Sequence, residues 1–489
     1  MSSRDPRFDG RFVVAVTSTG IYCRPSCPSR TPRRENVRFF RVAAAAEASG
    51  FRACRRCRPD VGPASPEWNM RGDLVARALR LIAGGAVDQD GVTGLARRLA
   101  VSERHLHRQL VAEVGAGPQT LAINRRAQVA RLLLESGTLP MTQVAFAAGY
   151  SSLRQFNDGM RSAFGCPPSE LRRGKTGDPA EGGGYLVLRL RYRVPLASGL
   201  LVEWLGARAW PGLEVVEGGC YHRTMRLPRG SGHIAVEFDR VREAASYGEA
   251  RMRLSLTDLR DVTTAVQSCR EVFDLDADPV MIAEGFHPDP LMGPLIAARP
   301  GLRVPGCADG FELAVRAVLG QQVSLPAARM LGGRLVARFG EPIQTPNPHL
   351  THLFPTPQAL AEADLETIGL TSRRAATVRA LSQAICLDKL VLDRGADREE
   401  SVAALLALPG IGPWTAGYIA MRALGDPDVF LSNDLGLCNA MKSLGMAGNP
   451  RAMAAHAERW SPWRSYAAMH LWASRPAPER SDRDQAGAI

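Results

Sequence analysis

Four cysteines near the start of the chain are spaced in a way that suits metal binding. Three residues separate Cys23 from Cys27, two separate Cys54 from Cys57, and 26 residues lie between the two pairs. Two short cysteine pairs of this kind can close a tetrahedral thiolate site around one divalent cation, most often zinc. A segment this short would gain much of its folding free energy from the metal. Two disulfides or unrelated thiols are the alternative, which a reducing compartment disfavours.

Such a site would also be reactive. Four thiolates around one divalent cation carry a net charge of about −2, so the sulfurs are electron-rich nucleophiles at neutral pH. The flanking sequence is rich in arginines that would attract phosphates to the sulfurs: Arg24, Arg30, Arg33, Arg34, Arg55, Arg56 and Arg58. This combination suits attack of a thiolate on an electrophilic carbon of DNA.

A second stretch that could carry chemistry is LPGIGPWTAGYIAMRALGDPDVFLSND, residues 408–434. Gly410 and Gly412 lie in an apolar turn that lacks the length and the Lys-Ser/Thr pair of a nucleotide-binding P-loop. The turn suits a helix–hairpin–helix, in which glycines let the backbone turn tightly and the next helix presents its first amides to a DNA phosphate. An ordinary corner between two helices is the alternative.

Two aromatic residues and a carboxylate follow this turn. Trp414 and Tyr418 are spaced i,i+4 and share one helix face, where they would either pack in the core or wall a base pocket. An aromatic face attracts a cationic alkylated base by about 0.5–2 kcal/mol, and such a base must first be flipped out of the duplex. Asp434 would either cap a helix, or stabilise positive charge at C1′ as an N-glycosidic bond breaks and orient the attacking water. Asp426 and Asp428 are interpreted as turn formers.

The elements before this stretch are those expected of a DNA-binding protein. Residues 68–174 are predicted to be helical, with two helix–turn–helix patterns joined by a long helix over 119–136. The second helix of each pattern is predicted to begin at Ser102 and at Ser151 or Ser152. A pair of structural corners is the alternative. The polar residues of these two helices are Arg104, His105, His107 and Arg108 in the first, and Arg154 and Gln155 in the second.

Beyond residue 174 the pattern changes. Residues 175–184 have the composition of a flexible linker. In YLVLRLRYRVPL, apolar residues at even positions from 186 to 192 alternate with arginines at 189, 191 and 193, which predicts a half-buried strand. HIAVEFD and ARMRLSLTDL predict further strands, and 198–210 and 259–274 predict helices. Cys220 and Cys269 are expected to be core thiols. The chain is helical from 299 onward.

Charge divides the chain unequally. Residues 1–174 contain 27 arginines, no lysine and 14 acidic residues, a balance of +13, whereas the remainder holds 34 basic and 35 acidic residues, a balance of −1. A cationic front third favours a polyanionic partner. The chain opens with no signal-peptide pattern and contains no run of about 18 apolar residues, which predicts no membrane association and a cytoplasmic, nucleoid-associated protein.

The front half resembles two known families. GIYCRPSCPSRTPRRENVRFF and GFRACRRCRPD are similar to the zinc domain of Ada-type methylphosphotriester-DNA methyltransferases, and the paired helix–turn–helix patterns resemble an AraC-type DNA-binding domain. The resemblance implies zinc on Cys23, Cys27, Cys54 and Cys57, and a stoichiometric, irreversible transfer of a methyl group to Cys23. Methylation would lower the negative charge of the site and so raise its affinity for DNA.

Residues 185 to about 475 resemble the AlkA-type 3-methyladenine DNA glycosylase II family. Besides residues 408–434, the resemblance is carried by AARPGLRVPGCADGFELAVRAVLGQQVS and ERWSPWRSYAAMHLWA. By motif match it implies the following roles: Asp434 as the catalytic aspartate, Trp414, Tyr418 and Trp472 as the base pocket, and Gly410 and Gly412 as the hairpin on the phosphate backbone.

Four departures from these families bear on function. Trp414 stands where bifunctional relatives have a lysine, which implies hydrolysis without Schiff-base strand cleavage. Gln322 stands where some relatives insert a leucine into the gap left by the flipped base. Asn433 stands where relatives can have a second acid, which leaves Asp434 as the one candidate. The Pro-Cys-His-Arg motif of O6-methylguanine transferases does not occur in the sequence.

The sequence therefore predicts a multidomain protein: a small zinc α+β domain (1–65), an all-α double helix–turn–helix (68–174), a linker (175–184), an AlkA N-terminal-like α+β domain (185–298), an all-α helix–hairpin–helix glycosylase domain (299–475) and a disordered tail (476–489). The expected DNA contacts are Gly410, Gly412, Gln322, Arg56, Arg104, Arg108 and Arg154.

The predicted function is adaptive-response repair of alkylated DNA. Cys23 would accept methyl groups from phosphotriesters, the helix–turn–helix domain would regulate transcription at promoter DNA with RNA polymerase as a partner, and Asp434 would support hydrolytic release of bases such as 3-methyladenine. Two alternatives remain open. One is a transcription regulator whose back half only binds DNA, and the other is a repair glycosylase whose front half only targets it to DNA.

Overall fold

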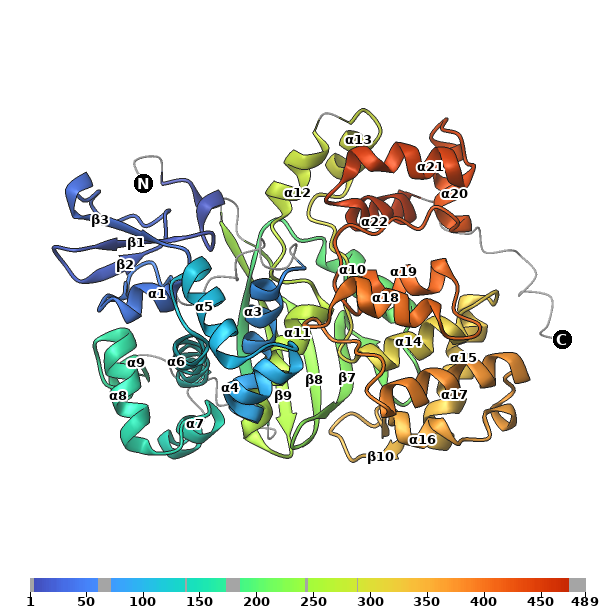
Figure 1. Cartoon of the computed structure of the whole chain (residues 1–489), viewed down its shortest axis with the longest axis horizontal. Coiled ribbons are helices and arrows are strands. Elements are labelled where there is room, and N and C mark those ends of the chain that lie inside the picture. The colour runs from blue at the N-terminus through green and yellow to red at the C-terminus, as the bar shows by residue number, and fades with distance from the viewer. Residues whose placement is uncertain are drawn as a thin grey trace.

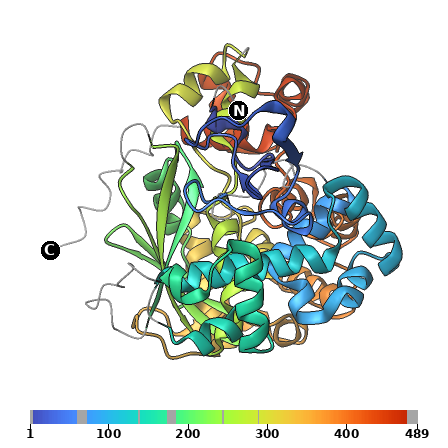
Figure 2. The same cartoon turned by 90° about the vertical axis from the view of Figure 1, so that its left-hand side faces the viewer.

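The computed structural model describes residues 4–59, 72–136, 139–172, 185–241, 245–287 and 289–474. The predicted linker at 175–184 and the predicted disordered tail at 476–489 lie outside these residues. A five-stranded sheet occupies the middle of the molecule, with the N-terminal units on one side and most of the C-terminal helices on the other (Figures 1 and 2). Across the described ranges, no helix combines the length and apolar character needed to cross a membrane.

The N-terminal unit is a small sheet with one helix. Its strands are β1 (Val13–Val16), β2 (Ile21–Cys23), β3 (Val37–Phe40) and β4 (Arg52–Ala53), in the order β3-β1-β2-β4, and its helix is α1 (Ala43–Ala48). The β1 pairs are antiparallel, whereas β2 and β4 are parallel. The parallel pair matters for the site, because it brings the residues that follow β2 and β4 to the same end of the sheet.

The next unit consists of helices, as predicted. They are α3 (Leu74–Gly84), α4 (Ala86–Arg98), α5 (Glu103–Val114), α6 (Pro118–Ser136), α7 (Met141–Ala147), α8 (Leu153–Phe164) and α9 (Pro168–Arg172). Ser102 caps α5 by accepting from the His105 amide at 3.2 Å, and Ser152, rather than Ser151, caps α8 by accepting from the Gln155 amide at 3.2 Å. The two predicted helix–turn–helix copies and the long helix between them are therefore confirmed.

The central sheet has the order β5-β9-β8-β7-β6 and is antiparallel throughout. Its strands are β5 (Leu186–Arg193), β6 (Glu214–Glu217), β7 (Cys220–Leu227), β8 (Gly230–Phe238) and β9 (Tyr247–Leu256), flanked by α10 (Ser198–Ala207) and α11 (Val262–Val272). The predicted alternation in β5 holds up to Tyr192. Arg193, predicted on the polar face, is instead buried, because it donates to the carbonyls of Asp276 at 2.9 Å and Asp9 at 3.1 Å.

The remaining elements are mostly helices. They are α12 (Pro279–Phe286), α13 (Met292–Ala298), α14 (Gly310–Leu319), α15 (Leu325–Phe339), α16 (Pro357–Ala361), α17 (Ser372–Cys386), α18 (Arg398–Leu406), α19 (Pro413–Arg422), α20 (Leu435–Ser443), α21 (Pro450–Ala457) and α22 (Arg464–Ser474), with a short pair β10 (Glu341–Pro342) and β11 (His352–Leu353). One core joins α14–α19, and a second joins α12 and α13 to α20–α22. The hairpin between α18 and α19 lies near the boundary of these two cores.

The front and back halves of the chain are in direct contact. Arg77 on α3 pairs with Asp397 at 3.1 Å and donates to the Gly395 carbonyl at 2.9 Å. Arg98 on α4 pairs with Asp393 at 2.7 Å. Part of the arginine excess of the front half is therefore used to hold the loop before α18, residues 393–397, rather than being free for DNA.

Candidate active sites

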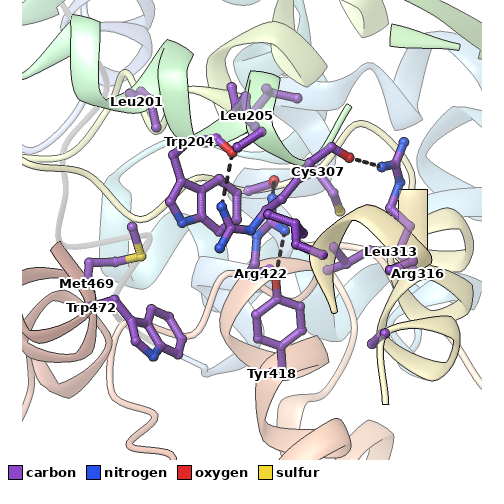
Figure 3. Close-up of a pocket in the computed structure, with 18 of the residues that line it drawn as sticks. Leu201, Trp204, Leu205, Cys307, Leu313, Arg316, Tyr418, Arg422, Met469 and Trp472 are labelled. Atoms are coloured by element: carbon purple, nitrogen blue, oxygen red, sulfur yellow. Dashed lines mark hydrogen bonds between the residues drawn. The ribbon is translucent and has the colours of Figure 1, made fainter. Parts of the chain in front are cut away.

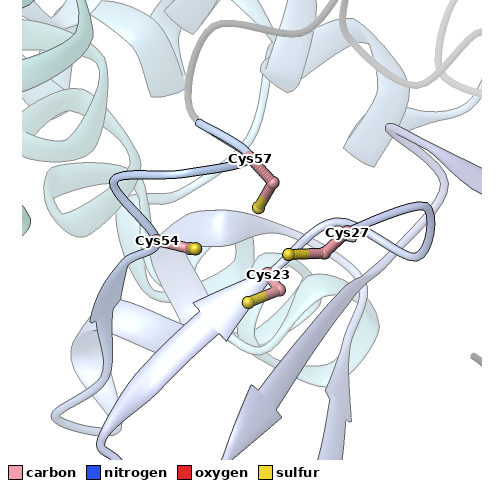
Figure 4. Close-up of side chains that lie close together, drawn as sticks. All are labelled: Cys23, Cys27, Cys54 and Cys57. Carbon is pink, nitrogen blue, oxygen red and sulfur yellow. The ribbon is translucent and has the colours of Figure 1, made fainter. Parts of the chain in front are cut away.

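The four N-terminal cysteines form one cluster (Figure 4). Cys23 ends β2 and Cys54 follows β4, so the parallel pairing of these strands places the two cysteines side by side. Cys27 and Cys57 lie in the turns that follow. The four sulfur atoms all lie within 4.8 Å of one another, and all four cysteines are free and buried.

This arrangement fits a zinc ion. Tetrahedral coordination at a zinc–sulfur distance of about 2.3 Å requires sulfurs about 3.8 Å apart, which the cluster can reach with small movements. Hydrogen bonds to Cys54 and Cys57, and then burial, raise the pKa of the Cys23 thiol. A thiol in this setting is a poor nucleophile by itself, whereas coordination to a divalent cation deprotonates it.

The arginines around this cluster have different surroundings. Arg56 is exposed, as expected of a DNA contact. Arg55 and Arg58 instead hold the cysteine unit to the helical unit: Arg55 donates to the Gly165 carbonyl at 3.3 Å, and Arg58 pairs with Glu135. These contacts join residues more than 70 positions apart, so no local pattern in the sequence could have indicated them.

The predicted recognition helices present their arginines to solvent. Arg104 and Arg108 are exposed on α5, and Arg108 lies 3.1 Å from the His105 ring nitrogen. Arg154 on α8 has a side chain that is 93% exposed, with Asp158 at 4.0 Å as its nearest ion-pair partner. All three guanidinium groups are open to solvent, as predicted for DNA contacts.

The hairpin between α18 and α19 has the geometry that its glycines predict. Gly410 adopts a φ of +85°, and a Cβ atom there would lie 2.1 Å from the Thr377 hydroxyl, so glycine is required. Gly412 is exposed and is the N-cap residue of α19. Pro413 has no N–H, so the amides of the residues after it at the start of α19 are the ones that could bind a phosphate.

Gln322 lies in the exposed turn between α14 and α15. Its φ of +52° is uncommon for a residue with a side chain. Its neighbour Gln321 holds the turn to the hairpin by donating to the Gly410 carbonyl at 3.0 Å and to the Thr415 hydroxyl at 3.1 Å. The turn that bears Gln322 is thus joined by hydrogen bonds to the hairpin between α18 and α19.

A cavity of about 660 Å³ opens beside the hairpin (Figure 3). Trp414, Tyr418 and Trp472 line it together with Asp434, so residues from α19, α22 and the start of α20 meet in one place. The Trp414 and Tyr418 rings stack with centroids 5.3 Å apart and an interplanar angle of 6°. The prediction that Trp414 and Tyr418 share one side of the helix is confirmed. Because the two rings stack on each other, a base cannot insert between them.

Asp434 is both a helix cap and a cavity residue. Its Oδ1 accepts from the Leu437 amide at 2.8 Å, which caps α20, and from Trp472 Nε1 at 2.9 Å. Its Oδ2 accepts from Trp414 Nε1 at 2.9 Å. The two interpretations of this residue from sequence were therefore not alternatives. The bond from each tryptophan to the carboxylate was not predicted.

Further cavity residues were not predicted from the sequence. Trp204, from α10, has two guanidinium groups close to its ring, with Arg208 at 3.8 Å and Arg422 at 4.5 Å from the ring centroid. Arg422 also donates to the Tyr418 hydroxyl at 2.9 Å. Arg422 follows Tyr418 by four positions on one helix face, a signal that could have identified it. Trp204 belongs to a distant segment and carries no such signal.

The cavity wall also contains two buried carboxylates, Glu214 and Glu312, which are neutralised. Arg223 pairs with them at 3.1 and 2.8 Å, and Arg316 pairs with them at 2.7 and 2.8 Å. Because both glutamates are buried and each is paired with both arginines, neither glutamate is placed to act on a substrate. Asp434, by contrast, accepts from neutral N–H groups and has no ion-pair partner among the described residues.

Comparison with known families agrees with this division of the chain. Residues 1–60 match the model of the metal binding domain of Ada, and residues 95–174 match a helix-turn-helix domain. Residues 187–309 match the AlkA N-terminal domain, and residues 315–465 match the HhH-GPD superfamily of base excision DNA repair proteins. The prediction of a bound zinc ion is confirmed by the first of these matches together with the four-cysteine cluster.

Individual relatives give the same picture. The chain is 49% identical to the "Probable bifunctional transcriptional activator/DNA repair enzyme AlkA" of Mycobacterium tuberculosis, over 98% of this chain and 96% of that protein. It is 33% identical to the "DNA-3-methyladenine glycosylase 2" of Escherichia coli, over 58% of this chain and 95% of that one. The "Bifunctional transcriptional activator/DNA repair enzyme Ada" of Escherichia coli is 36% identical over 35% of this chain and 47% of its own length.

A solved structure extends the comparison to the fold. The 3-methyladenine DNA-glycosylase from Archaeoglobus fulgidus superposes with a TM-score of 0.50 at 21% identity, covering 58% of this chain and 96% of that one. The central sheet and the C-terminal helices therefore share a fold with a known glycosylase.

Proposed function

The chain belongs to the family of bifunctional transcriptional activator and DNA repair enzymes of the AlkA type, and from this we propose that it excises alkylated bases at Asp434 and accepts methyl groups from DNA at Cys23. The observation that carries the proposal is the convergence of three aromatic rings and one carboxylate on a single cavity beside the hairpin. We propose 3-methyladenine as a substrate, because that base is named for a relative that spans the whole back half.

Base release follows from the positions of these residues. A flipped base would enter between the Trp414–Tyr418 pair and Trp472, with its sugar next to Asp434. The C1′–N bond breaks, its electron pair stays with the base, and the carboxylate stabilises the positive charge left at C1′. Water then adds to C1′ and loses a proton to solvent. A cationic base such as 3-methyladenine leaves as a neutral molecule, so no protonating group is needed.

The three N–H groups that bind Asp434 support an electrostatic role over a proton-accepting one. A carboxylate that already accepts three hydrogen bonds is held in one orientation, with most of its lone pairs occupied. We therefore propose that Asp434 stabilises the developing cation, and that orienting water is secondary. The sequence had left both roles open.

The reaction is proposed to be hydrolysis without strand cleavage. Strand cleavage through a Schiff base needs an amine nucleophile next to C1′. Trp414 stands at the position where bifunctional relatives have a lysine, and none of the residues that line the cavity is a lysine. Absence of a borohydride-trapped adduct with lesion DNA is the expected result, and a trapped adduct would refute this part of the proposal.

Methyl transfer is proposed for the cysteine cluster. Cys23, Cys27, Cys54 and Cys57 would hold zinc, which keeps the thiols deprotonated when it is bound. The Cys23 sulfur forms a bond to the methyl carbon of a phosphotriester as the carbon–oxygen bond breaks, and the electron pair of that bond goes to the phosphate. The products are a thioether and a repaired phosphodiester, so each molecule would act once.

The front half is proposed to regulate transcription. The exposed arginines of α5 and α8 support binding of promoter DNA, with Arg104, Arg108 and Arg154 as contacts and RNA polymerase as a further partner. Gly410, Gly412, Gln322 and Arg56 are proposed as the other DNA contacts. A promoter-binding assay with methylated and unmethylated protein would distinguish a regulator from a repair enzyme whose front half only targets it to DNA.

Two variants test the two repair activities separately. The full chain is incubated with DNA that carries 3-methyladenine and methylphosphotriesters, while released base is measured by chromatography and the protein by intact mass. Asp434→Asn should release base at least about 100-fold more slowly and still gain one methyl group, whereas Cys23→Ala should gain no methyl group and release base at the normal rate. Base release by Asp434→Asn within threefold of normal, or methyl uptake that persists in Cys23→Ala, would refute the corresponding assignment.

A further inference from the structure

The loop between Cys23 and Cys27 is fixed by a buried carboxylate. Asp9, which is 2% exposed, accepts from the Ser26 amide at 3.0 Å and from the Ser26 hydroxyl at 2.5 Å. It also accepts from the Tyr247 hydroxyl at 3.0 Å. Tyr247 lies at the start of β9, in the central sheet of the glycosylase half. A ligand loop of the cysteine cluster is therefore held through Asp9 by a residue more than 200 positions away.

Arg24, the residue after Cys23, makes the second contact with the same tyrosine. Its guanidinium lies 5.0 Å from the centroid of the Tyr247 ring, and its Nε lies 3.6 Å from an Asp9 oxygen. The Arg24 side chain remains 22% exposed. The guanidinium is thus stacked on a ring and close to a carboxylate, yet still accessible from solvent.

Other contacts make the same interface rigid. The buried Arg193, from β5, donates to the Asp9 carbonyl at 3.1 Å, and Arg7 pairs with Glu284 at 3.0 Å. Both join the N-terminal unit to the glycosylase half. Tyr247 and Asp9 therefore lie at an interface that Arg193, a buried residue, also joins.

We propose that Tyr247 is a positioning residue for methyl transfer, which holds Arg24 as a phosphate contact beside Cys23, so that the glycosylase half completes the methyl-acceptor site. This inference rests on the proposed role of Cys23. A phosphotriester is neutral, but the phosphates on either side of it are anions, and a guanidinium on the residue that follows the acceptor cysteine can bind one of them. The conformational entropy of the Arg24 side chain is then already lost before DNA binds. This favours the geometry in which the phosphotriester lies next to Cys23.

The contact with Asp9 does not block this role. At 3.6 Å the Arg24 Nε is beyond hydrogen-bonding distance from the Asp9 oxygen, whose strong partners are Ser26 and Tyr247. The terminal nitrogens of Arg24 can therefore approach a phosphate while its Nε stays near Asp9. An inhibitory contact would instead need a tight bidentate pair that DNA has to break.

The test compares three variants of the full chain. Tyr247→Leu removes the ring and the hydroxyl, Tyr247→Phe keeps the ring and removes the hydroxyl, and Tyr185→Phe is a matched control on the same half without a contact to Asp9. The rate of methyl uptake from methylphosphotriester DNA is measured by intact mass. Tyr247→Leu should be slower by about tenfold, and Tyr247→Phe by only about threefold because it keeps the ring on which Arg24 stacks.

Two further readouts separate positioning from a structural effect. Zinc content and 3-methyladenine excision should be the same in all three variants. The salt dependence of binding to methylphosphotriester DNA should decrease in Tyr247→Leu by about one phosphate contact. Equal rates of methyl uptake in Tyr247→Leu and the unaltered protein would overturn the inference, as would a faster rate. If the unaltered protein takes up no methyl group, the proposed function of Cys23 has failed instead.

Discussion

Replacing Asp434 by asparagine changes the cavity in a way that the hydrogen bonds define. Three N–H groups converge on the carboxylate: the Leu437 amide and Trp472 Nε1 on Oδ1, and Trp414 Nε1 on Oδ2. An asparagine can keep only one oxygen. If that oxygen takes the Oδ1 position, it retains two of the three bonds, and the new NH2 group then faces the Trp414 N–H, donor against donor.

The consequences can be estimated from this geometry. Asparagine is as good an N-cap as aspartate, so α20 should persist. The unpaired Trp414 donor should lower the free energy of unfolding by about 1–3 kcal/mol. Loss of the charge that we propose stabilises C1′ should lower the rate of base release by at least about 100-fold. Asp434→Asn is therefore expected to impair both the chemistry and the shape of the pocket.

A double-mutant cycle measures the effect of the unpaired Trp414 donor on the pocket. Trp414→Phe keeps a ring on α19 but removes the donor, so it should be destabilising when Asp434 is intact and nearly neutral, or stabilising, in the Asp434→Asn background. The free energy of unfolding is measured for both single variants and for the double variant. Base release by the same proteins is measured under single-turnover conditions. Asp364→Asn, an exposed change in the same half, is the control. Equal effects of Trp414→Phe in both backgrounds, or base release by Asp434→Asn within threefold of normal, would refute the reasoning.

Three other perturbations of the two sites have defined outcomes. Trp472→Phe keeps the stacking surface but removes one donor to Asp434. Single-turnover base release should therefore fall by about tenfold, whereas DNA affinity should change little. An unchanged rate of base release would mean that the Trp472 indole only stacks. Removing zinc with a chelator should unfold the cysteine unit and abolish methyl uptake while base excision persists, and methyl uptake by zinc-free protein would contradict this. Burial lowers the pKa of His470, on α22 next to the cavity, from 6.5 to about 4. Since the unfolded chain then binds the proton more strongly, stability is complete above about pH 6.5 and decreases toward pH 4 by up to about 3 kcal/mol. Unfolding followed by tryptophan fluorescence should show a smaller decrease for His470→Gln, and equal decreases would exclude this histidine.

Local signals in the sequence account for most of what was predicted correctly. The zinc ligands come in pairs within a few residues. Ser102 and Ser152 cap their helices by accepting from the amide three residues later. Trp414 and Tyr418 lie on one side of a helix because they are four residues apart. Each of these features depends on neighbours along the chain. Both roles of Asp434, as helix cap and as cavity carboxylate, were also considered from the sequence.

What the sequence did not indicate depends on contacts between distant segments. Strands β6 and β7 place charged residues in the interior: Arg223 is buried, where Glu214 and Glu312 pair with it. Arg193 has the position of an exposed residue in its strand, but it is buried and donates to the carbonyls of Asp276 and Asp9, which are distant along the chain. Trp204 enters the cavity from α10. A burial pattern cannot predict such residues, since their partners come from another unit of the fold.

The contact of Arg77 and Arg98 with the loop at 393–397 has a consequence for how lesions are found. Because the two halves are docked, DNA held by one half is presented to the other at an effective concentration of about a millimolar or more. Capture of a DNA segment by the arginine-rich front half would then lengthen the time that the glycosylase spends sampling nearby bases. The search for damaged bases should therefore depend on ionic strength through arginines that never touch the cavity.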